Sequence, residues 1–181
     1  ADGIHINELL GQNTEENDNF KNGAQMGWQN LNYTSYQNAM GFAAGSADVK
    51  NFNPGNGGRT FGAAVGYAES HDEVRIAYQM KTYGANANIK YSGAHPGVNG
   101  VQRLGSVAAY MLMAPGAKMI WQFGEIGADD KLGSDLEKLR AIAPKWDQFE
   151  NENRKALFEN YQALCYLRLK NPELFDGSAD Y

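Results

Sequence analysis

Two stretches of the chain are almost continuously small or apolar, which is typical of strands buried on both faces of a parallel sheet. Residues 62–68 read Gly-Ala-Ala-Val-Gly-Tyr-Ala, and residues 119–123 read Met-Ile-Trp-Gln-Phe. Two shorter β-prone runs, at 4–7 and 25–28, predict two further strands. Polar residues follow these runs, so we expect four strands with polar ends.

Apolar residues at helical spacing predict three helices, at 34–43, 104–112 and 151–170. Pro115 and Pro172 follow the second and third of them, where a residue that cannot continue a helix closes it. Polar segments rich in Gly, Asn or Glu predict three loops, at 11–22, 51–59 and 84–100.

Strand and helix alternate along the chain in four units, which predicts an α/β fold with a parallel sheet and right-handed crossovers. The 181 residues, of which 43% are hydrophobic, suffice for one substantial core. A closed (β/α)8 barrel has eight such units in about 250 residues, so four units correspond to half of one. In such barrels the chemistry lies in the loops where strands end.

Composition excludes several classes of function. The net charge of −5, with no basic stripe, argues against a nucleic-acid partner. The longest apolar run, residues 107–114, is far short of the roughly 20 residues that a membrane span needs. Cys165 is the only cysteine and cannot form an internal disulfide. The three histidines lack the spacing of zinc ligands, so we expect no metal site.

Four polar residues stand at predicted strand ends: Glu8, His71, Asp72 and Glu125. Residues 67–73, Tyr-Ala-Glu-Ser-His-Asp-Glu, resemble the fourth conserved region of the α-amylase family (glycoside hydrolase family 13), where a hydrophobic strand ends in a polar residue followed by His-Asp. Four further segments are similar to parts of the same family in the same order. They are 4–11 (the third conserved region), 27–40 (the sixth strand and its helix), 114–127 (the eighth strand and its Gly-Glu loop) and 145–172 (the last barrel helix).

The resemblance implies the C-terminal half, strands 5 to 8 with their helices, of a (β/α)8 TIM barrel. It makes residues 1–176 a partial catalytic domain and 177–181 the start of a linker to a following domain. It also implies a retaining glycosidase, in which one carboxylate attacks the sugar and a second carboxyl group serves as acid and then base. By resemblance Glu8, which lies 64 residues before Asp72, is the acid/base. Asp72 and His71 hold sugar hydroxyls during cleavage, and Glu125 contacts substrate.

The family's nucleophile is an aspartate in a Gly-Phe-Arg-x-Asp-like segment, and the 181 residues contain no such segment. We therefore expect this chain alone to be inactive. The implied substrates are starch-like α-1,4-glucan polysaccharides and oligosaccharides, and the resemblance leaves hydrolysis and glucosyl transfer open. We expect no cofactor in this segment, whereas a full-length parent could hold calcium. By resemblance the protein is extracellular or periplasmic.

Two alternatives remain open at this point. The chain could be a non-catalytic, glycosidase-like binding or structural module. It could also be an unrelated α/β protein with an accidental His-Asp pair, in which case Glu8 and Asp72 should lie on different faces of the sheet. A half barrel exposes two strand edges, so we also expect self-association.

Overall fold

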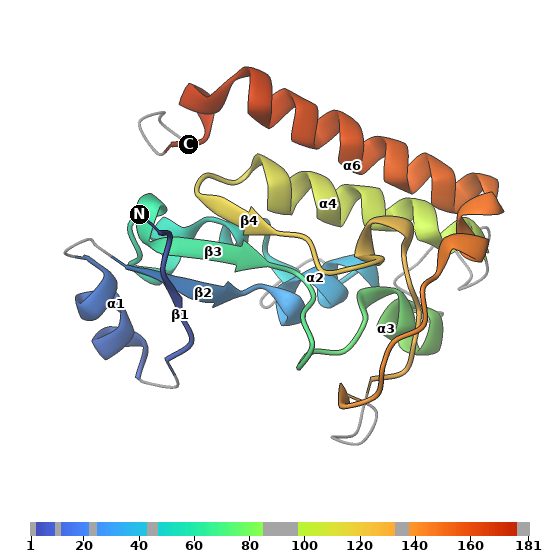
Figure 1. The fold of residues 1–181 in the computed structure, drawn as a ribbon, viewed down its shortest axis with the longest axis horizontal. Coiled ribbons are helices and arrows are strands. Elements are labelled where there is room, and N and C mark those ends of the chain that lie inside the picture. Colours follow the sequence, from blue (N-terminus) through green and yellow to red (C-terminus); the bar gives the residue numbers. More distant parts are fainter. Residues whose placement is uncertain are drawn as a thin grey trace.

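The computed structural model of the chain describes residues 3–9, 12–21, 25–42, 47–84, 98–132 and 138–176. It has a four-stranded sheet in the order β1-β2-β3-β4, and each neighbouring pair is parallel (Figure 1). The strands are β1 (Ile6–Asn7), β2 (Met26–Asn30), β3 (Ala64–Tyr67) and β4 (Ala117–Met119). The predicted α/β fold with a parallel sheet is confirmed. The expected linker, 177–181, and most of the expected loop 84–100 lie outside the described residues.

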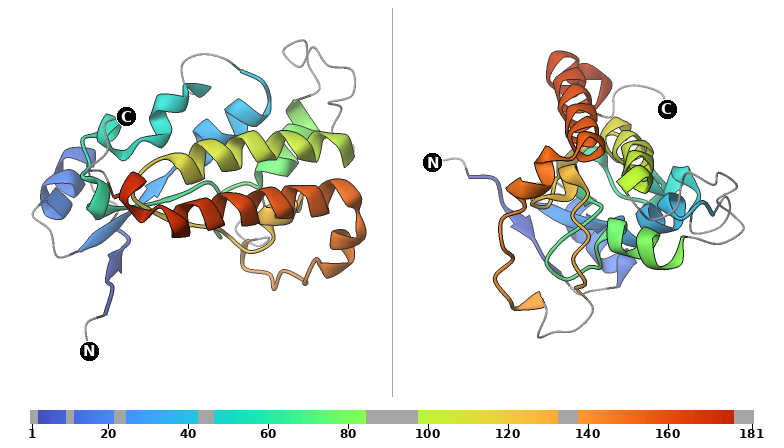
Figure 2. Two further views of the ribbon diagram at one scale, coloured as in Figure 1. Left: turned by 90° about the horizontal axis from the view of Figure 1, so that it is seen from above. Right: turned by 90° about the vertical axis from the view of Figure 1, so that its right-hand side faces the viewer.

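Five α-helices are described: α1 (Asn13–Lys21), α2 (Asn32–Ala39), α3 (Ile76–Tyr83), α4 (Leu104–Met113) and α6 (Glu152–Lys170). Helices α4 and α6 lie side by side, and α2 packs against both α3 and α4 (Figures 1 and 2). Short 3-10 turns occupy Val49–Phe52, Pro54–Gly57, Phe61–Ala63, Val98–Arg103, Gly124–Ile126, Trp146–Glu150 and Pro172–Leu174. None of the described helices is long and apolar enough to cross a membrane.

The core lies among α2, α3, α4 and α6 together with residues just beyond the strands. Its largest helical members are Ile76, Met80, Leu104, Val107, Met111, Leu112, Leu157 and Tyr161, each no more than 9% exposed. Removing such side chains from water stabilises the fold by about 1.5–3 kcal/mol each. The predicted helices over 104–112 and 151–170 are confirmed, and Asn151 begins the second by accepting hydrogen bonds from the N–H groups of Asn153 and Arg154.

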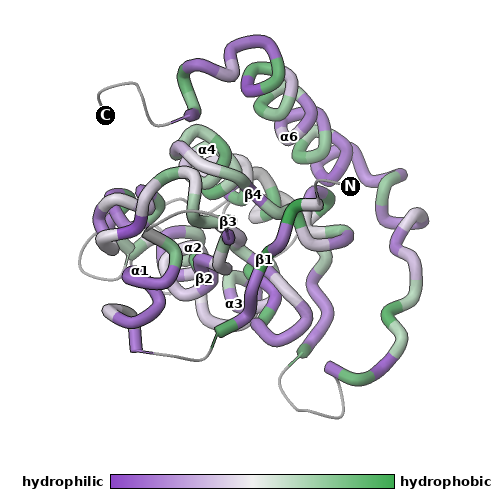
Figure 3. The backbone as a smooth tube through the Cα atoms, turned by 60° about the vertical axis from the view of Figure 1, so that its left-hand side comes forward, coloured by the Kyte–Doolittle hydropathy of each residue, from purple (hydrophilic) through white to green (hydrophobic). Residues whose placement is uncertain are grey.

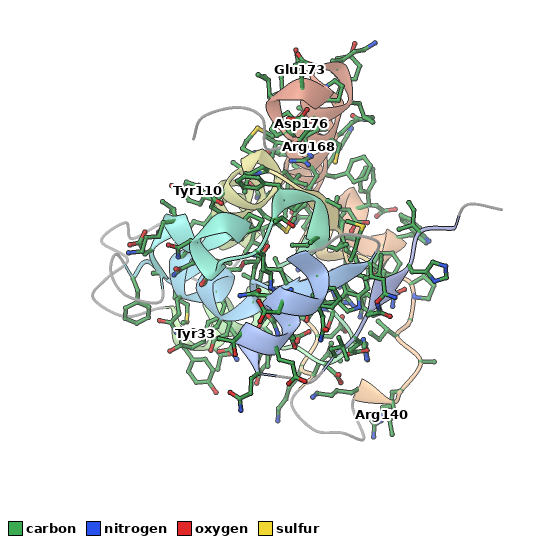
Figure 4. The ribbon with its side chains drawn as sticks, turned by 90° about the vertical axis from the view of Figure 1, so that its left-hand side faces the viewer. Tyr33, Tyr110, Arg140, Arg168, Glu173 and Asp176 are labelled. Carbon is green, nitrogen blue, oxygen red and sulfur yellow. The ribbon has the colours of Figure 1, made fainter. Side chains whose placement is uncertain are left out.

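Helix α6 is tied to the turn between α4 and β4 by Arg168 (Figure 4). Its guanidinium donates hydrogen bonds to the carbonyl oxygens of Leu112, Ala114 and Gly116. It also lies 4.4 Å above the centre of the Phe175 ring. One side chain therefore satisfies three backbone carbonyls at the end of α4 and in the turn that follows it.

The prediction of a loop over 11–22 is wrong, because α1 occupies most of it. Helix α1 is hydrophilic over most of its length, so apolar periodicity could not reveal it (Figure 3). Its contact with the rest of the molecule depends on Phe20, which is 2% exposed. The ring lies so close to β2 that a Cβ on Gly27 would come within 2.4 Å of it. Gly27 is therefore required for close packing.

The last strand is also misplaced by the prediction, which put it at 119–123 rather than Ala117–Met119. Met119 pairs with Tyr67, the last residue of β3. Because β3 leaves the sheet after Tyr67, residues beyond Met119 have no strand to pair with. The chain then turns at Phe123, whose φ of 64° places it in the left-handed region.

Candidate active site

Because the four strands are parallel, their carboxyl ends lie at one edge of the sheet. Glu8 follows β1, and Asn30 is the last residue of β2. The segment from Glu69 to Arg75 connects β3 to α3, and we call it the β3–α3 loop (Figure 1). It carries His71 and Asp72 at its tip. The fold therefore delivers polar groups from different parts of the sequence to one place.

Three of the four sequence-predicted residues come together at this edge. Glu8, His71 and Asp72 each offer a side-chain N or O atom, and these atoms all lie within 4.8 Å of one another. The Nε2 atom of His71 is 3.4 Å from Oδ2 of Asp72, and the two side chains are 59% and 55% exposed. The group is open to solvent and accessible to a ligand.

One imidazole and two carboxylates are also a possible ligand set for a divalent cation. The three groups are all exposed, and exposed acidic groups are common without a bound ion. Nothing else in the described structure points to a metal here. We therefore treat the group as a polar binding site.

A cleft of about 470 Å³ opens beside these residues. Glu8 and Asp72 line it, together with polar and aromatic residues from α1, β2, β3 and the following segments: Asn7, Glu16, Asn17, Phe20, Trp28, Gln29, Asn30, Arg59, Tyr67 and Glu73. The Trp28 and Tyr67 rings meet edge to face, with centroids 5.7 Å apart. The cleft thus brings carboxylates, amides and aromatic rings together around one opening.

Helix α1 forms one wall of the cleft and is held there by two interactions. Arg59 makes an ion pair of 2.5 Å with Glu16 and donates a hydrogen bond of 2.8 Å to the carbonyl of Trp28. The side-chain amide of Asn17 donates to the carbonyl of Gly57 at 2.8 Å. The helix that the sequence did not predict therefore contributes to the site.

Glu73 lies within the cleft and is held by three donors. Asn30 Nδ2 donates to its carboxylate at 2.6 Å, the Tyr67 hydroxyl donates at 3.3 Å, and the Ser70 hydroxyl donates to its other oxygen. Burial, and then the nearby charge of Glu73, raise the pKa of the Tyr67 phenol well above its usual range. Tyr67 therefore stays a neutral hydrogen-bond donor throughout the physiological range.

The base of the β3–α3 loop is buried and joined by side chains. Glu69 Oε2 accepts a hydrogen bond of 2.9 Å from Arg75 Nη1, and Glu69 Oε1 accepts one of 2.7 Å from the N–H of Ile76, the first residue of α3. Asn32 Nδ2 donates to the carbonyls of Ala68 and Val74, both at 2.8 Å. Only the tip of the loop is left to solvent.

Glu125, the fourth predicted residue, lies elsewhere. It does not line the cleft, and its charge adds to burial, the largest cause, in raising the pKa of Glu69 and of Tyr161. Burial is the largest cause of the raised pKa of Glu69, and Arg75 opposes it. Among the described residues, Glu125 Oε2 is buried with no hydrogen-bond partner. The structure thus turns Glu125 toward the interior beside the loop base.

Four charged residues of this region were not predicted from the sequence: Arg59, Glu69, Glu73 and Arg75. Glu69 and Arg75 are six residues apart, a spacing that does not place two side chains on one helix face, and the residues between them form neither a helix nor a strand. Their pairing follows from the path of the loop, for which the sequence has no periodic signal. No protein-family model matches the sequence, and no curated protein matches it.

Proposed function

We propose that the cleft at the carboxyl edge of the sheet is part of a retaining α-glucan glycosidase site, in the C-terminal half of an α-amylase-type barrel. One observation carries the proposal. Glu8, His71 and Asp72 stand after two different strands, yet their polar atoms lie within 4.8 Å of one another. This is the juxtaposition that the resemblance requires, and an accidental His-Asp pair gives no reason for it. The four parallel strands are also compatible with half of a barrel.

In the proposed reaction Glu8 donates its proton to the glycosidic oxygen as the bond to the anomeric carbon breaks. A carboxylate outside these 181 residues attacks that carbon and forms the covalent intermediate. Glu8 then removes a proton from the water that releases the sugar. Asp72 and His71 hold the hydroxyls of the same sugar, and their side chains lie 3.4 Å apart. The chain alone is expected to bind α-glucans and not to cleave them.

The test is the affinity of the chain for maltoheptaose, an α-1,4 oligosaccharide, measured by isothermal titration calorimetry. Asp72→Asn is expected to weaken binding by about 10-fold or more, because a hydrogen bond to a charged group contributes about 1.5–3 kcal/mol. Asp147→Asn is the matched control, since this exposed carboxylate lies outside the cleft. Cellohexaose, the β-linked counterpart, is expected to bind much more weakly.

Equal affinity of the Asp72→Asn and parent chains would contradict the proposed site, as would failure of the parent to bind maltoheptaose. The proposal would also be contradicted if the chain hydrolysed starch and the substitutions Glu8→Gln and Asp72→Asn left that activity unchanged. If the parent binds and a longer form that carries the missing carboxylate still cleaves nothing, the non-catalytic binding module is the better reading.

The edge strands of the sheet favour self-association of the chain. Within the described residues β1 and β4 are outer strands, each paired on one side only. Ile4 and Ile6 expose 82% and 38% of their surface beside one of these edges. Unpaired strand edges with apolar neighbours favour pairing with a second chain. We expect light scattering at increasing concentration to show self-association, and a constant monomer mass would refute it.

A further inference from the structure

We propose that the buried pair of Glu69 and Arg75 positions His71 and Asp72 in the glycan site. The inference rests on the proposed function, and its test includes a measurement that needs no glycan. Glu69 and Arg75 do not contact the cleft, so both are positioning residues. They act through the loop that joins them.

The pair closes the β3–α3 loop at its base. Arg75 is fully buried and Glu69 is 8% exposed in its side chain, and the two are 2.9 Å apart. The second oxygen of Glu69 binds the N–H of Ile76 at 2.7 Å, which fixes the loop to the start of α3. One carboxylate therefore joins the first residue of the loop, its last residue and the next helix.

Two further hydrogen bonds connect the base of the loop to its tip. The Ser70 hydroxyl donates to the Glu73 carboxylate, and the N–H of Asp72 donates to Ser70 Oγ at 3.2 Å. The His71 ring lies with its centroid 6.1 Å from that of Trp121, which follows β4. The base and interior of the loop are therefore bonded through buried or half-buried side chains, and His71 and Asp72 are its two exposed residues. Asp72 also lies 3.8 Å from the ammonium group of Lys138.

A charged pair is unusual at a buried position such as the base of this loop. Burying two charges is costly, and an apolar pair of similar volume often stabilises a fold as well or better. Apolar contacts, however, tolerate sliding, whereas a carboxylate between a guanidinium and an N–H has one satisfactory geometry. The pair is thus suited to fixing where the loop starts and ends, and hence where its tip lies.

A substitution outside the loop can disturb the Glu69–Arg75 pair most selectively. A Cβ on Gly124, in the segment after β4, would lie 2.7 Å from Oε2 of Glu69 and would force the carboxylate to move. Gly124→Ala therefore disturbs the pair without altering any loop residue. Gly62→Ala is the matched control, because a Cβ there meets no atom within 4 Å. Glu69→Gln, which keeps the shape and removes the charge, is the second variant.

Two readouts are measured on the folded variants. The first is the nuclear Overhauser effect between the rings of His71 and Trp121, which we expect to weaken severalfold in Gly124→Ala and Glu69→Gln but not in Gly62→Ala. The second is the affinity for maltoheptaose, expected to fall by about 10-fold with the circular dichroism unchanged, because misplacing two polar contacts costs about that much.

An unchanged ring contact in both Gly124→Ala and Glu69→Gln would overturn the inference, whatever the glycan result. A weakened contact with unchanged maltoheptaose affinity would overturn it as well, because the pair would then have a structural role only. If the parent chain binds no maltoheptaose while the ring contact weakens as expected, the positioning of His71 stands and the proposed glycan function falls.

Discussion

Replacing Arg75 by methionine is expected to lower the free energy of unfolding by about 3–5 kcal/mol, because it leaves the Glu69 carboxylate buried beside an apolar side chain. Glu69 would keep only its hydrogen bond from the N–H of Ile76. Urea unfolding at neutral pH, followed by circular dichroism, measures the loss. Arg140→Met is the control, since Arg140 is exposed at the surface (Figure 4).

The double variant Glu69→Met with Arg75→Met is expected to recover most of this loss. Among the described residues, Arg75 Nε and Nη2 are buried with no hydrogen-bond partner, so the native pair is itself incompletely satisfied. Burial raises the pKa of Glu69, and without Arg75 nothing of opposite charge opposes that rise. A raised folded-state pKa favours folding at low pH, so the single variant should lose stability as pH rises above the ordinary carboxyl range. A loss below about 1 kcal/mol at pH 7 would contradict the prediction.

The free energy of unfolding is also expected to rise by about 2 kcal/mol between pH 7 and pH 9, because of Lys118. Burial, with a smaller contribution from Arg168, lowers the pKa of Lys118 from 10.5 to about 7. Between these two values the unfolded chain holds a proton that the folded chain has lost. Stability therefore increases with pH in this window, and the increase is lost as pH falls through the folded-state value. Urea unfolding at several pH values measures it.

Lys118→Met should remove this rise, whereas Lys155→Met, at an exposed position of α6, should retain it. The ammonium group of Lys118 donates hydrogen bonds to the carbonyls of Pro115 and Gly116 at 2.5 and 3.3 Å. Since neither partner is a carboxylate, the structure offers it little reason to stay charged. A flat profile from pH 7 to pH 9 in the parent chain would show that Lys118 is paired or hydrated in a different way.

Those parts of the fold that bury a continuous or periodic apolar pattern could be predicted from the sequence. The strand β3 is buried at all four of its residues, and a continuous run of small and apolar residues in the sequence indicates it clearly. Helix α6 buries Leu157 and Tyr161 at helical spacing. Helix α1 could not be found in this way, because Phe20 is its only apolar residue and its other contacts, through Glu16 and Asn17, are polar. The end of β4 depends on where its neighbour β3 stops, which local sequence does not record.

The residues of the candidate site also differ in whether the sequence predicted them. Glu8, His71 and Asp72 were predicted from strand ends and resemblance, and parallel strands bring such ends together. Glu69 also stands at a strand end, but nothing in its sequence context separates an inward carboxylate from an outward one. Its direction is decided by Arg75, whose burial follows from the packing of α3 on the core. The exposed group of Glu8, His71 and Asp72 was therefore predictable, whereas the other charged residues of the cleft, Glu73 and Arg59, and the buried pair of Glu69 and Arg75 were not.

The placement of the tryptophans makes the site optically accessible. Of the three in the chain, Trp28 lines the cleft and Trp121 lies beside His71, whereas Trp146 is 65% exposed and contacts the Phe123 ring. Indole emission depends on local polarity and on nearby quenching groups, so a ligand that displaces water from the cleft changes the emission of Trp28, and one that moves the His71 ring changes that of Trp121. Occupancy can then be followed in the unlabelled chain, with Trp146 as an internal reference for the surface.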